Sequence, residues 1–302
     1  MPKLKTKSKP TQEEKPEALR PYLFHGVDLD WGSSDQAISE CPFCGKEDKF
    51  HVSVDKGFWK CFTCDKGEGG NSTKFLQELW KDSLDATPIS TYEKLSESRG
   101  ISTETLIEWE LAFNPVNEKW VVPGWTVKGN LLQLYKYTTI KGKKRLLATP
   151  TKSHPHCLFG IVEKVKAADT VFICEGPWDA MALYEALKDY KIKKGEIEDW
   201  YDAAVMGIPG ANVFKEPWCS LLSGKEVIIM MDNDHPKVNE QTGKEMEPVG
   251  LKGTKRVVKI LSSDSNPPSE IKYLNWGPAG FDPNLPSGTD IRDFLNDGKG
   301  RE

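Results

Sequence analysis

Two acidic pairs in the second half of the chain have the spacing of a divalent-metal site. A short, continuous apolar run bounded by turn residues is typical of a buried parallel strand. Ligands of open α/β sheets bind beyond the carboxyl ends of such strands, and carboxylates there are suitable ligands for Mg²⁺. Two such runs end in acids, 171–174 before Glu175 and Asp179, and 227–231 before Asp232 and Asp234.

Four cysteines in the first half have the spacing of a zinc site. Cys41 and Cys44 form one C-x-x-C pair, and Cys61 and Cys64 form another after sixteen intervening residues. That separation is enough for a β-hairpin that brings the two pairs together. A module of this size cannot bury a sufficient core by itself, so the metal would be structural. The sequence therefore predicts a four-cysteine zinc ribbon with one Zn²⁺.

Aromatic and basic side chains alternate along the predicted hairpin of the ribbon. Stacking on single-stranded bases requires aromatic rings interleaved with cations, so we expect this surface to contact a nucleic-acid template. The alternative is that half of the rings face the core of the ribbon. The candidate contacts are His51, Trp59 and Lys60.

A basic track lies between Glu118 and Glu163, where the sequence has no Asp or Glu. The net charge of −4 excludes a uniformly basic nucleic-acid coat but not a local track. Phosphates are the obvious partners of such a track, although a solvated hairpin tip would carry the same charges. The candidate nucleotide- or template-binding residues in it are Lys128, Lys136, Lys141, Lys143, Lys144 and Arg145.

Length and composition indicate a soluble protein of two or three domains. The chain has 302 residues, of which 38% are hydrophobic. No apolar stretch approaches the ~18–20 residues of a membrane helix, and the first residues lack the apolar region of a secretory signal. The seven cysteines are therefore expected in a reducing compartment. We expect a cytoplasmic protein without a membrane partner.

The order of these parts resembles DNA primases of the bacterial and bacteriophage type, in which a zinc ribbon precedes a Toprim catalytic domain. The resemblance covers about residues 36–298 and rests on five motifs in this order. They are Cys41-Pro-Phe-Cys44-Gly with Lys60-Cys-Phe-Thr-Cys64, Arg99-Gly-Ile101, Leu158-Phe-Gly-Ile161, Glu175-Gly-x-x-Asp179 and Asp232-x-Asp234.

The resemblance implies a multidomain chain of the α+β and α/β classes. The implied parts are a flexible tail (1–35), the zinc ribbon (36–80), a linker (81–92), a basic α+β subdomain (93–168) and a Toprim domain with a mainly parallel sheet (169–302).

The resemblance also implies an activity, namely template-directed synthesis of short RNA primers on single-stranded DNA from ribonucleoside triphosphates. Glu175, Asp232 and Asp234 would hold one or two Mg²⁺ or Mn²⁺ ions for nucleotidyl transfer, supported by Asp179 and Asp290. The ribbon would read the initiation sequence on the template. The chain has no G-x-x-x-x-G-K-[ST] motif, so a replicative helicase would act as a separate partner or on a longer chain.

Three features depart from the primase pattern. Cys44 stands where the familiar bacterial motif has histidine, and residues 235–249 separate the second acidic pair from the next helix. Arg292 stands where bacterial relatives carry a second acid after Asp290, and Asp293 is an uncertain substitute. Two other functions remain open, a Toprim-type metal-dependent nuclease and a non-catalytic module that binds single-stranded DNA.

Overall fold

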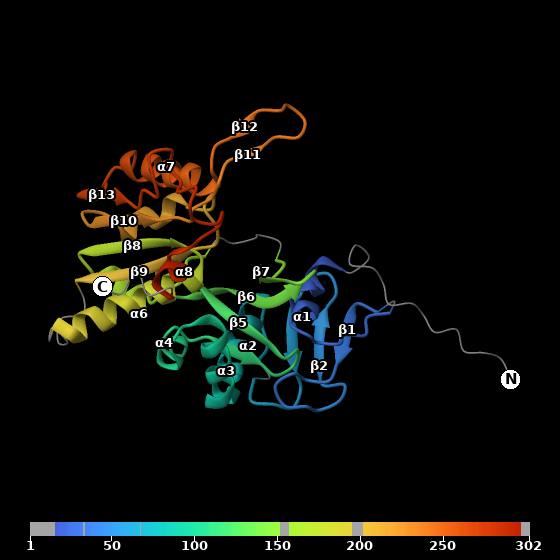
Figure 1. The fold of residues 1–302 in the computed structure, drawn as a ribbon. Coiled ribbons are helices and arrows are strands. Elements are labelled where there is room, and N and C mark those ends of the chain that lie inside the picture. The colour runs from blue at the N-terminus through green and yellow to red at the C-terminus, as the bar shows by residue number, and fades with distance from the viewer. Residues whose placement is uncertain (1–15, 33, 67, 152–156, 195–201, 297–302) are drawn as a thin grey trace. The chain divides into compact units, whose positions relative to one another are not determined.

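The computed structural model describes residues 16–32, 34–66, 68–151, 157–194 and 202–296 (Figure 1). The chain divides into two compact units. Unit 1 contains residues 1–86, 112–121 and 133–155, and unit 2 contains residues 87–111, 122–132 and 156–302. Within the described residues, no helix combines the length and the apolar character needed to cross a membrane.

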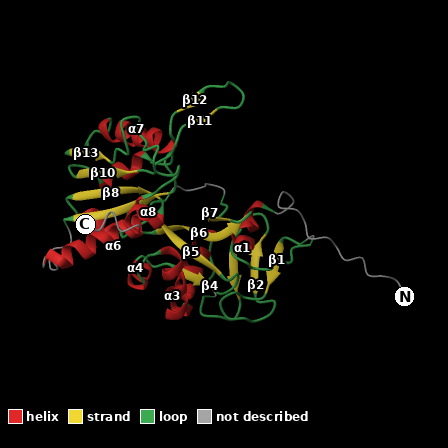
Figure 2. Ribbon diagram, viewed as in Figure 1, coloured by secondary structure: helices red, strands yellow, loops and turns green. Residues whose placement is uncertain are grey.

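The first part of unit 1 is a three-stranded antiparallel sheet followed by a helix. The strands are β1 (Gln36–Ser39), β2 (Phe50–Ser53) and β3 (Trp59–Cys61), and the helix is α2 (Ser72–Ala86) (Figure 2). Inward-facing rings of the strands and of α2 form the core, with Phe50, Trp59 and Phe75 almost completely buried. This arrangement confirms the predicted β-hairpin between the two cysteine pairs.

The segment before the ribbon is ordered where the sequence predicts a flexible tail. Residues 17–24 form a 3-10 turn, η2 (Glu17–Leu19), and a short helix, α1 (Arg20–Phe24). The Tyr22 ring is fully buried, and its centroid lies 4.5 Å from that of Phe75 in α2. The prediction of a tail is therefore wrong for residues 17–24, and residues 1–15 lie outside the described part of the chain.

Residues 81–92, predicted as a linker, are mostly helical. Helix α2 continues to Ala86, and α3 (Ile89–Arg99) begins directly after Pro88. The segment is polar in composition, but one face of its helix is buried. Ser83 on this face is fully buried, and its hydroxyl donates to the carbonyl of Leu79 within α2. The segment is therefore helical rather than irregular, and the boundary between the two compact units falls within it, between residues 86 and 87.

The second sheet has the strand order β4-β5-β6-β7. Its strands are β4 (Ala112–Asn114), β5 (Lys119–Trp125), β6 (Leu131–Ile140) and β7 (Lys143–Ala148). Residues 122–125 and 131–132 of this sheet belong to unit 2. Lys141 and Gly142 join β6 to β7 with φ values of 49° and 76°, as a two-residue hairpin turn with positive φ at both positions requires.

Unit 2 is built on a parallel sheet, which confirms the predicted α/β class. Its strands are β8 (Thr170–Glu175), β9 (Ala203–Ile208), β10 (Glu226–Met230) and β13 (Glu270–Tyr273), in the spatial order β13-β10-β8-β9. Every neighbouring pair is parallel. The strands are nearly continuous apolar runs because helices cover both faces of such sheets.

Two long helices connect the strands of this sheet. Helix α6 (Pro177–Lys194) leads from β8 to β9, and α7 (Val249–Ser262) leads from β10 towards β13. The two connections run in opposite directions across the sheet, so right-handed crossovers place the helices on opposite faces, as Figure 1 shows. The shorter elements of unit 2 are α4 (Thr103–Glu108), α5 (Val162–Ala167), η3 (Glu216–Leu221) and α8 (Ile291–Asn296).

The insertion at residues 235–249 forms a hairpin of its own. Strands β11 (Lys237–Val238) and β12 (Glu245–Met246) pair antiparallel. Both strands are exposed and extend away from the parallel sheet of unit 2 (Figure 1).

Candidate functional site

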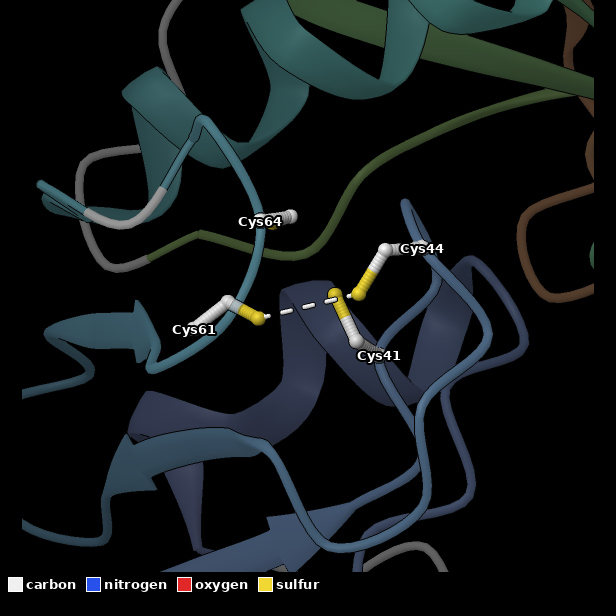
Figure 3. A group of neighbouring side chains, drawn as sticks. All are labelled: Cys41, Cys44, Cys61 and Cys64. Atoms are coloured by element: carbon white, nitrogen blue, oxygen red, sulfur yellow. Dashed lines mark hydrogen bonds between the residues drawn. The ribbon is translucent and has the colours of Figure 1, made fainter.

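The four cysteines of unit 1 converge on one point, as the spacing predicts (Figure 3). All four sulfur atoms lie within 4.8 Å of one another, and the Cys44 and Cys61 sulfurs are 3.9 Å apart. Four thiolates at ~2.3 Å from a tetrahedral zinc ion would be separated by about 3.8 Å. The residues therefore fit Zn²⁺, and the four-cysteine zinc site is confirmed.

Tight turns aim the thiols of this cluster. After Cys41, the backbone N–H of Gly45 donates to the Cys41 carbonyl at 2.9 Å. At Cys61, burial alone would raise the thiol pKa, but hydrogen bonds from the hydroxyl and N–H of Thr63 outweigh it and lower the pKa to about 6. Burial instead raises the pKa values of the Cys41 and Cys64 thiols, so at these two positions a bound metal would have to stabilise the thiolate that ligation requires.

The outer face of the ribbon differs from the prediction at one position. Trp59 is only 2% exposed and stacks on Phe50 with ring centroids 5.4 Å apart, so its ring is not available to bases. His51 and Lys60 are paired across β2 and β3. Both contact the ring of Phe62, which is 59% exposed. Phe62 therefore supplies the exposed ring that was predicted for Trp59.

The basic track is exposed at most of its predicted positions. Four cations lie on the hairpin of β6 and β7 in unit 1, and one lies at the β5–β6 turn in unit 2. Lys136 is the exception, since its ammonium donates to the Phe24 carbonyl at 2.7 Å and lies 3.8 Å from the Phe24 ring centroid. Burial lowers the pKa of Lys136, and its side chain is engaged by the fold. The exposed cations are Lys128, Lys141, Lys143, Lys144 and Arg145.

The acidic pairs lie at adjacent strand ends of unit 2. Strand β8 continues to β9 on one side and β10 continues to β13 on the other, so the switch in strand order lies between β8 and β10. This is where open α/β sheets bind ligands. Glu175 ends β8, and Asp232 follows β10, whose Met230 is paired with Cys174. The backbone register alone therefore brings the two acidic pairs together.

Both acids of the first pair have a buried oxygen without a hydrogen-bond partner. Gly176 turns the chain from β8 into α6 with φ of 114°, a value that strains any residue with a Cβ. Asp179 then lies in the first turn of α6, almost completely buried. In the described part of the chain, Glu175 Oε2 and Asp179 Oδ1 have no partner. Such atoms need an explanation, and a bound ion is one of them.

Crowding of like charges raises the pKa values of these carboxyls. For Asp232, burial followed by the charges of Glu175, Asp179, Asp290 and Asp234 raises the pKa to about 10. Burial and the Asp290 charge raise the pKa of Asp179 well above its usual value. Burial and the Asp234 charge raise that of Glu175. Hard oxygen donors crowded in this way fit Mg²⁺ or Mn²⁺.

The carboxylates do not converge on one point as closely as the four cysteines do. Among the described residues, only the four cysteines bring three or more possible ligand atoms within 4.8 Å of one another. The fit of the acids to a divalent ion thus rests on donor chemistry, unpartnered oxygens and mutual repulsion.

Asn233, between the two acids of the second pair, holds this segment in place. It is fully buried. Its Oδ1 accepts from the N–H of Asp282 at 2.8 Å, and its Nδ2 donates to the Asp282 carbonyl at 3.1 Å. Its backbone N–H donates to the Thr289 carbonyl, immediately before Asp290. No sequence pattern predicts that Asn233 links the second acidic pair to the segment that carries Asp290.

We expect Asn233→Ala to destabilise unit 2 by about 2–4 kcal/mol, because the fully buried Asn233 amide and its hydrogen bonds to the partly buried backbone of Asp282 would be lost. Chemical denaturation followed by circular dichroism measures the change. Asn266→Ala, which removes an exposed amide, should change stability by less than ~0.5 kcal/mol. Equal effects of the two substitutions would contradict the role of Asn233.

Two arginines also lie at the carboxylate cluster. Asp290 accepts from the Arg292 guanidinium at 3.0 Å through Oδ2 and from the N–H of Asp293 at 2.7 Å through Oδ1. Arg99, at the end of α3, places its guanidinium 4.4 Å from the Trp178 ring centroid, next to Asp179. In the sequence, Arg292 stands out only as a departure from the primase pattern, and Arg99 only as part of a motif. Neither pattern predicts that these side chains lie at the carboxylate cluster.

Residues 24–105 match the CHC2 zinc finger family. The chain is also similar to solved structures, including the Aquifex aeolicus primase (zinc-binding and RNA polymerase domains), at 16% identity and a TM-score of 0.45 over 95% of this chain and 81% of that one. The primase fragment of the bacteriophage T7 primase-helicase protein has 18% identity and a TM-score of 0.45 over 87% and 95% of the two chains. A search of the curated proteins finds no match.

The DnaG catalytic core has 16% identity to this chain and a TM-score of 0.48, over 74% of each chain. The resemblance that the motifs indicate is confirmed for the zinc ribbon, because residues 24–105 match the CHC2 zinc finger family. Cys44 completes a four-cysteine version of this finger.

Proposed function

We propose that this chain is a DNA primase that synthesises short RNA primers on a single-stranded DNA template. The observation that carries the proposal is the carboxylate cluster at the ends of β8 and β10, in a chain that also has a CHC2 zinc finger. A zinc module suits template recognition, and clustered carboxylates suit metal-dependent phosphoryl chemistry. Zinc modules and carboxylate clusters each occur in proteins with other functions, so only their combination in one chain favours a primase.

In the proposed reaction, Glu175, Asp232 and Asp234 hold divalent metal, Mg²⁺ or Mn²⁺. When bound, the metal supplies positive charge at the α-phosphate of the incoming nucleotide and favours ionisation of the attacking 3′-hydroxyl. The chain fixes the ligands through its backbone, since Asp234 Oδ2 accepts from the N–H of Gly250 at 3.0 Å. A side chain at Gly250 would collide with the Asp232 carbonyl, so glycine permits this close approach.

The proposed nucleic-acid contacts lie in both units. On the ribbon, Phe62 would stack on bases while Lys60 and His51 flank it, and the cations of the β6–β7 hairpin would contact phosphates. The further partners in the proposal are ribonucleoside triphosphates and a replicative helicase, either separate or on a longer chain.

The test is a synthesis assay with the full chain, single-stranded templates of varied sequence, four ribonucleotides and Mg²⁺. We expect new oligoribonucleotides in the wild type and none with Asp232→Ala. Asp264→Ala, an acid outside the cluster, should leave synthesis within about twofold of the wild type. Template cleavage without synthesis would replace the proposal with a metal-dependent nuclease. Template binding without either reaction, unaffected by Asp232→Ala, would leave a binding module.

The exposed cations of the β6–β7 hairpin are expected to bind the template backbone. Replacing Lys143, Lys144 and Arg145 by alanine should lower affinity for single-stranded DNA about 10–100-fold at low salt. The slope of log affinity against log salt should fall by about 2, since each phosphate contact contributes about 0.7. Fluorescence anisotropy across a salt series measures both changes.

The matched control removes three exposed cations of α7 by substituting Lys252, Lys255 and Lys259 with alanine. This variant loses the same total charge. An equal loss of affinity in the two triple variants would mean that net charge, rather than the hairpin, determines binding.

A further inference from the structure

Asp290 differs from the other carboxylates of the cluster because the fold occupies both of its oxygens. Oδ2 accepts from the Arg292 guanidinium at 3.0 Å, and Oδ1 accepts from the N–H of Asp293 at 2.7 Å. The side chains of Asp290 and Arg292 are only 13% and 15% exposed. At this depth, solvent competes little for the pair, and breaking it would leave a buried charge without a partner.

The acids proposed as metal ligands lack a cationic partner in the part of the chain that the structure describes, although Asp234 Oδ2 accepts from the N–H of Gly250. Within the described residues, no ion pair involves Glu175, Asp232 or Asp234, and Glu175 Oε2 is buried without a hydrogen bond. The largest effects on the pKa of Asp232 are burial and then the charges of four carboxylates, and all of these raise it. The uncompensated negative charge of the cluster is therefore concentrated on its β8–β10 side.

Positive charge lies at the Asp179 and Asp290 part of the cluster, from Arg99 at the end of α3 and Arg292 in α8. A Cβ on Gly100, next to Arg99, would lie 2.7 Å from the amide nitrogen of Asn296, so the end of α3 packs directly against α8. The guanidinium of Arg99 is held on the Trp178 ring. Arg99 and Arg292 both lower the pKa of Asp179, against the larger effects of burial and Asp290. Two fixed guanidinium groups thus partly compensate the pair Asp179 and Asp290.

We infer that Arg292 is a built-in counter-cation that withdraws Asp290 from metal binding, so that the cluster binds a single divalent ion on its Glu175–Asp232–Asp234 side. This inference rests on the proposed function in one respect, that the cluster binds a divalent metal. A second divalent ion beside Asp290 would have to displace the guanidinium or lie next to its positive charge. Arg292 is therefore a positioning residue that fixes the number of metal ions.

The test is Mn²⁺ binding to the full, zinc-loaded chain, followed by the electron paramagnetic resonance signal of free Mn²⁺. The wild type should bind one Mn²⁺, and Asp232→Asn should weaken binding at least tenfold. Asp290→Asn should change the affinity by less than threefold. Arg292→Gln should bind a second Mn²⁺, which Asp290→Asn in the same chain should abolish. Arg292→Lys keeps the charge and should bind one.

Arg256→Gln, which removes an exposed cation of α7, is the control for net charge and should still bind one ion. A second ion in this control would overturn the inference. So would a single ion in folded Arg292→Gln, or a loss in Asp290→Asn equal to that in Asp232→Asn. If Arg292→Gln fails to fold, as judged by circular dichroism and zinc content, the comparison of Asp290→Asn with Asp232→Asn decides.

These failures leave the proposed function intact, since they change the number of ions and the role of Asp290 but not the site itself. Mn²⁺ binding by Asp232→Asn equal to that of the wild type would instead refute a metal site in the cluster. That result would refute both the inference and the proposed catalytic metal site. The synthesis assay tests the proposed function independently of the Mn²⁺ measurement.

Discussion

Cys61→Ser is expected to abolish zinc binding and unfold the ribbon of unit 1. Structural zinc contributes on the order of 10–16 kcal/mol to the folding of small zinc modules, and serine is a poor zinc ligand. Cys61 belongs to β3, and the same strand carries Trp59 into the aromatic core with Phe50. Loss of the metal should therefore also release the core. Zinc content by mass spectrometry and the near-ultraviolet circular dichroism of the chain, to which the packed rings of the ribbon core contribute, report the two effects.

Cys219→Ser is the matched control for this substitution. Cys219 is also a buried free cysteine, but it lies in unit 2 and outside the zinc cluster. It should keep one zinc ion per chain and the near-ultraviolet spectrum of the wild type. One bound zinc and an unchanged spectrum in Cys61→Ser would contradict the structural role of the site.

Asp232→Asn is expected to abolish activity and yet stabilise the metal-free protein. The loss of a metal ligand should lower the rate of synthesis about 10³-fold or more. In the absence of divalent ions, folding of the wild type must either protonate Asp232 or bury its charge among the other carboxylates, and asparagine avoids this cost. The substitution should therefore stabilise the fold by about 1–3 kcal/mol. Thermal unfolding in a chelator too weak to remove the zinc measures the second effect, and added Mg²⁺ should stabilise only the wild type.

The pH dependence of this stabilisation follows from the raised pKa of Asp232. Its pKa is about 10 in the folded protein and about 3.9 when unfolded. The folded state then holds the proton more tightly, so the wild type loses stability as the pH rises between these values. The advantage of Asp232→Asn should therefore be larger at pH 8 than at pH 5. Equal melting temperatures of the two proteins at both pH values would refute the electrostatic crowding.

The parts of the molecule that the sequence predicts well are set by short local patterns. The two C-x-x-C pairs need only a hairpin between them to converge, so Cys41 to Cys64 define the site directly. The acids at the ends of β8 and β10 are placed by apolar strands, whose parallel pairing brings Glu175 and Asp232 to one edge. In both cases, the backbone does most of the positioning.

The features that the sequence does not predict depend on which way a side chain faces or what it meets far along the chain. Trp59 and Lys60 are neighbours, and only the pairing of β3 shows that the tryptophan faces inward. Tyr22 becomes part of the ribbon core because of a distant ring, that of Phe75. Arg99 reaches the acids from a helix that lies about eighty residues earlier in the sequence. No local periodicity contains these contacts.

The hairpin of β11 and β12 begins and ends at nearly the same place. Asp234 precedes it and Gly250 follows it, and the two are joined by a hydrogen bond of 3.0 Å. The hairpin itself, residues 237–246, therefore forms a closed loop whose length does not affect the positions of the acids, whereas His235 contacts Asp282 and Ser287, and Val249 already belongs to α7. Evolution could lengthen, shorten or exchange this loop freely, whereas a single inserted residue within β8 or β10 would turn the following carboxylate to the other face of the sheet.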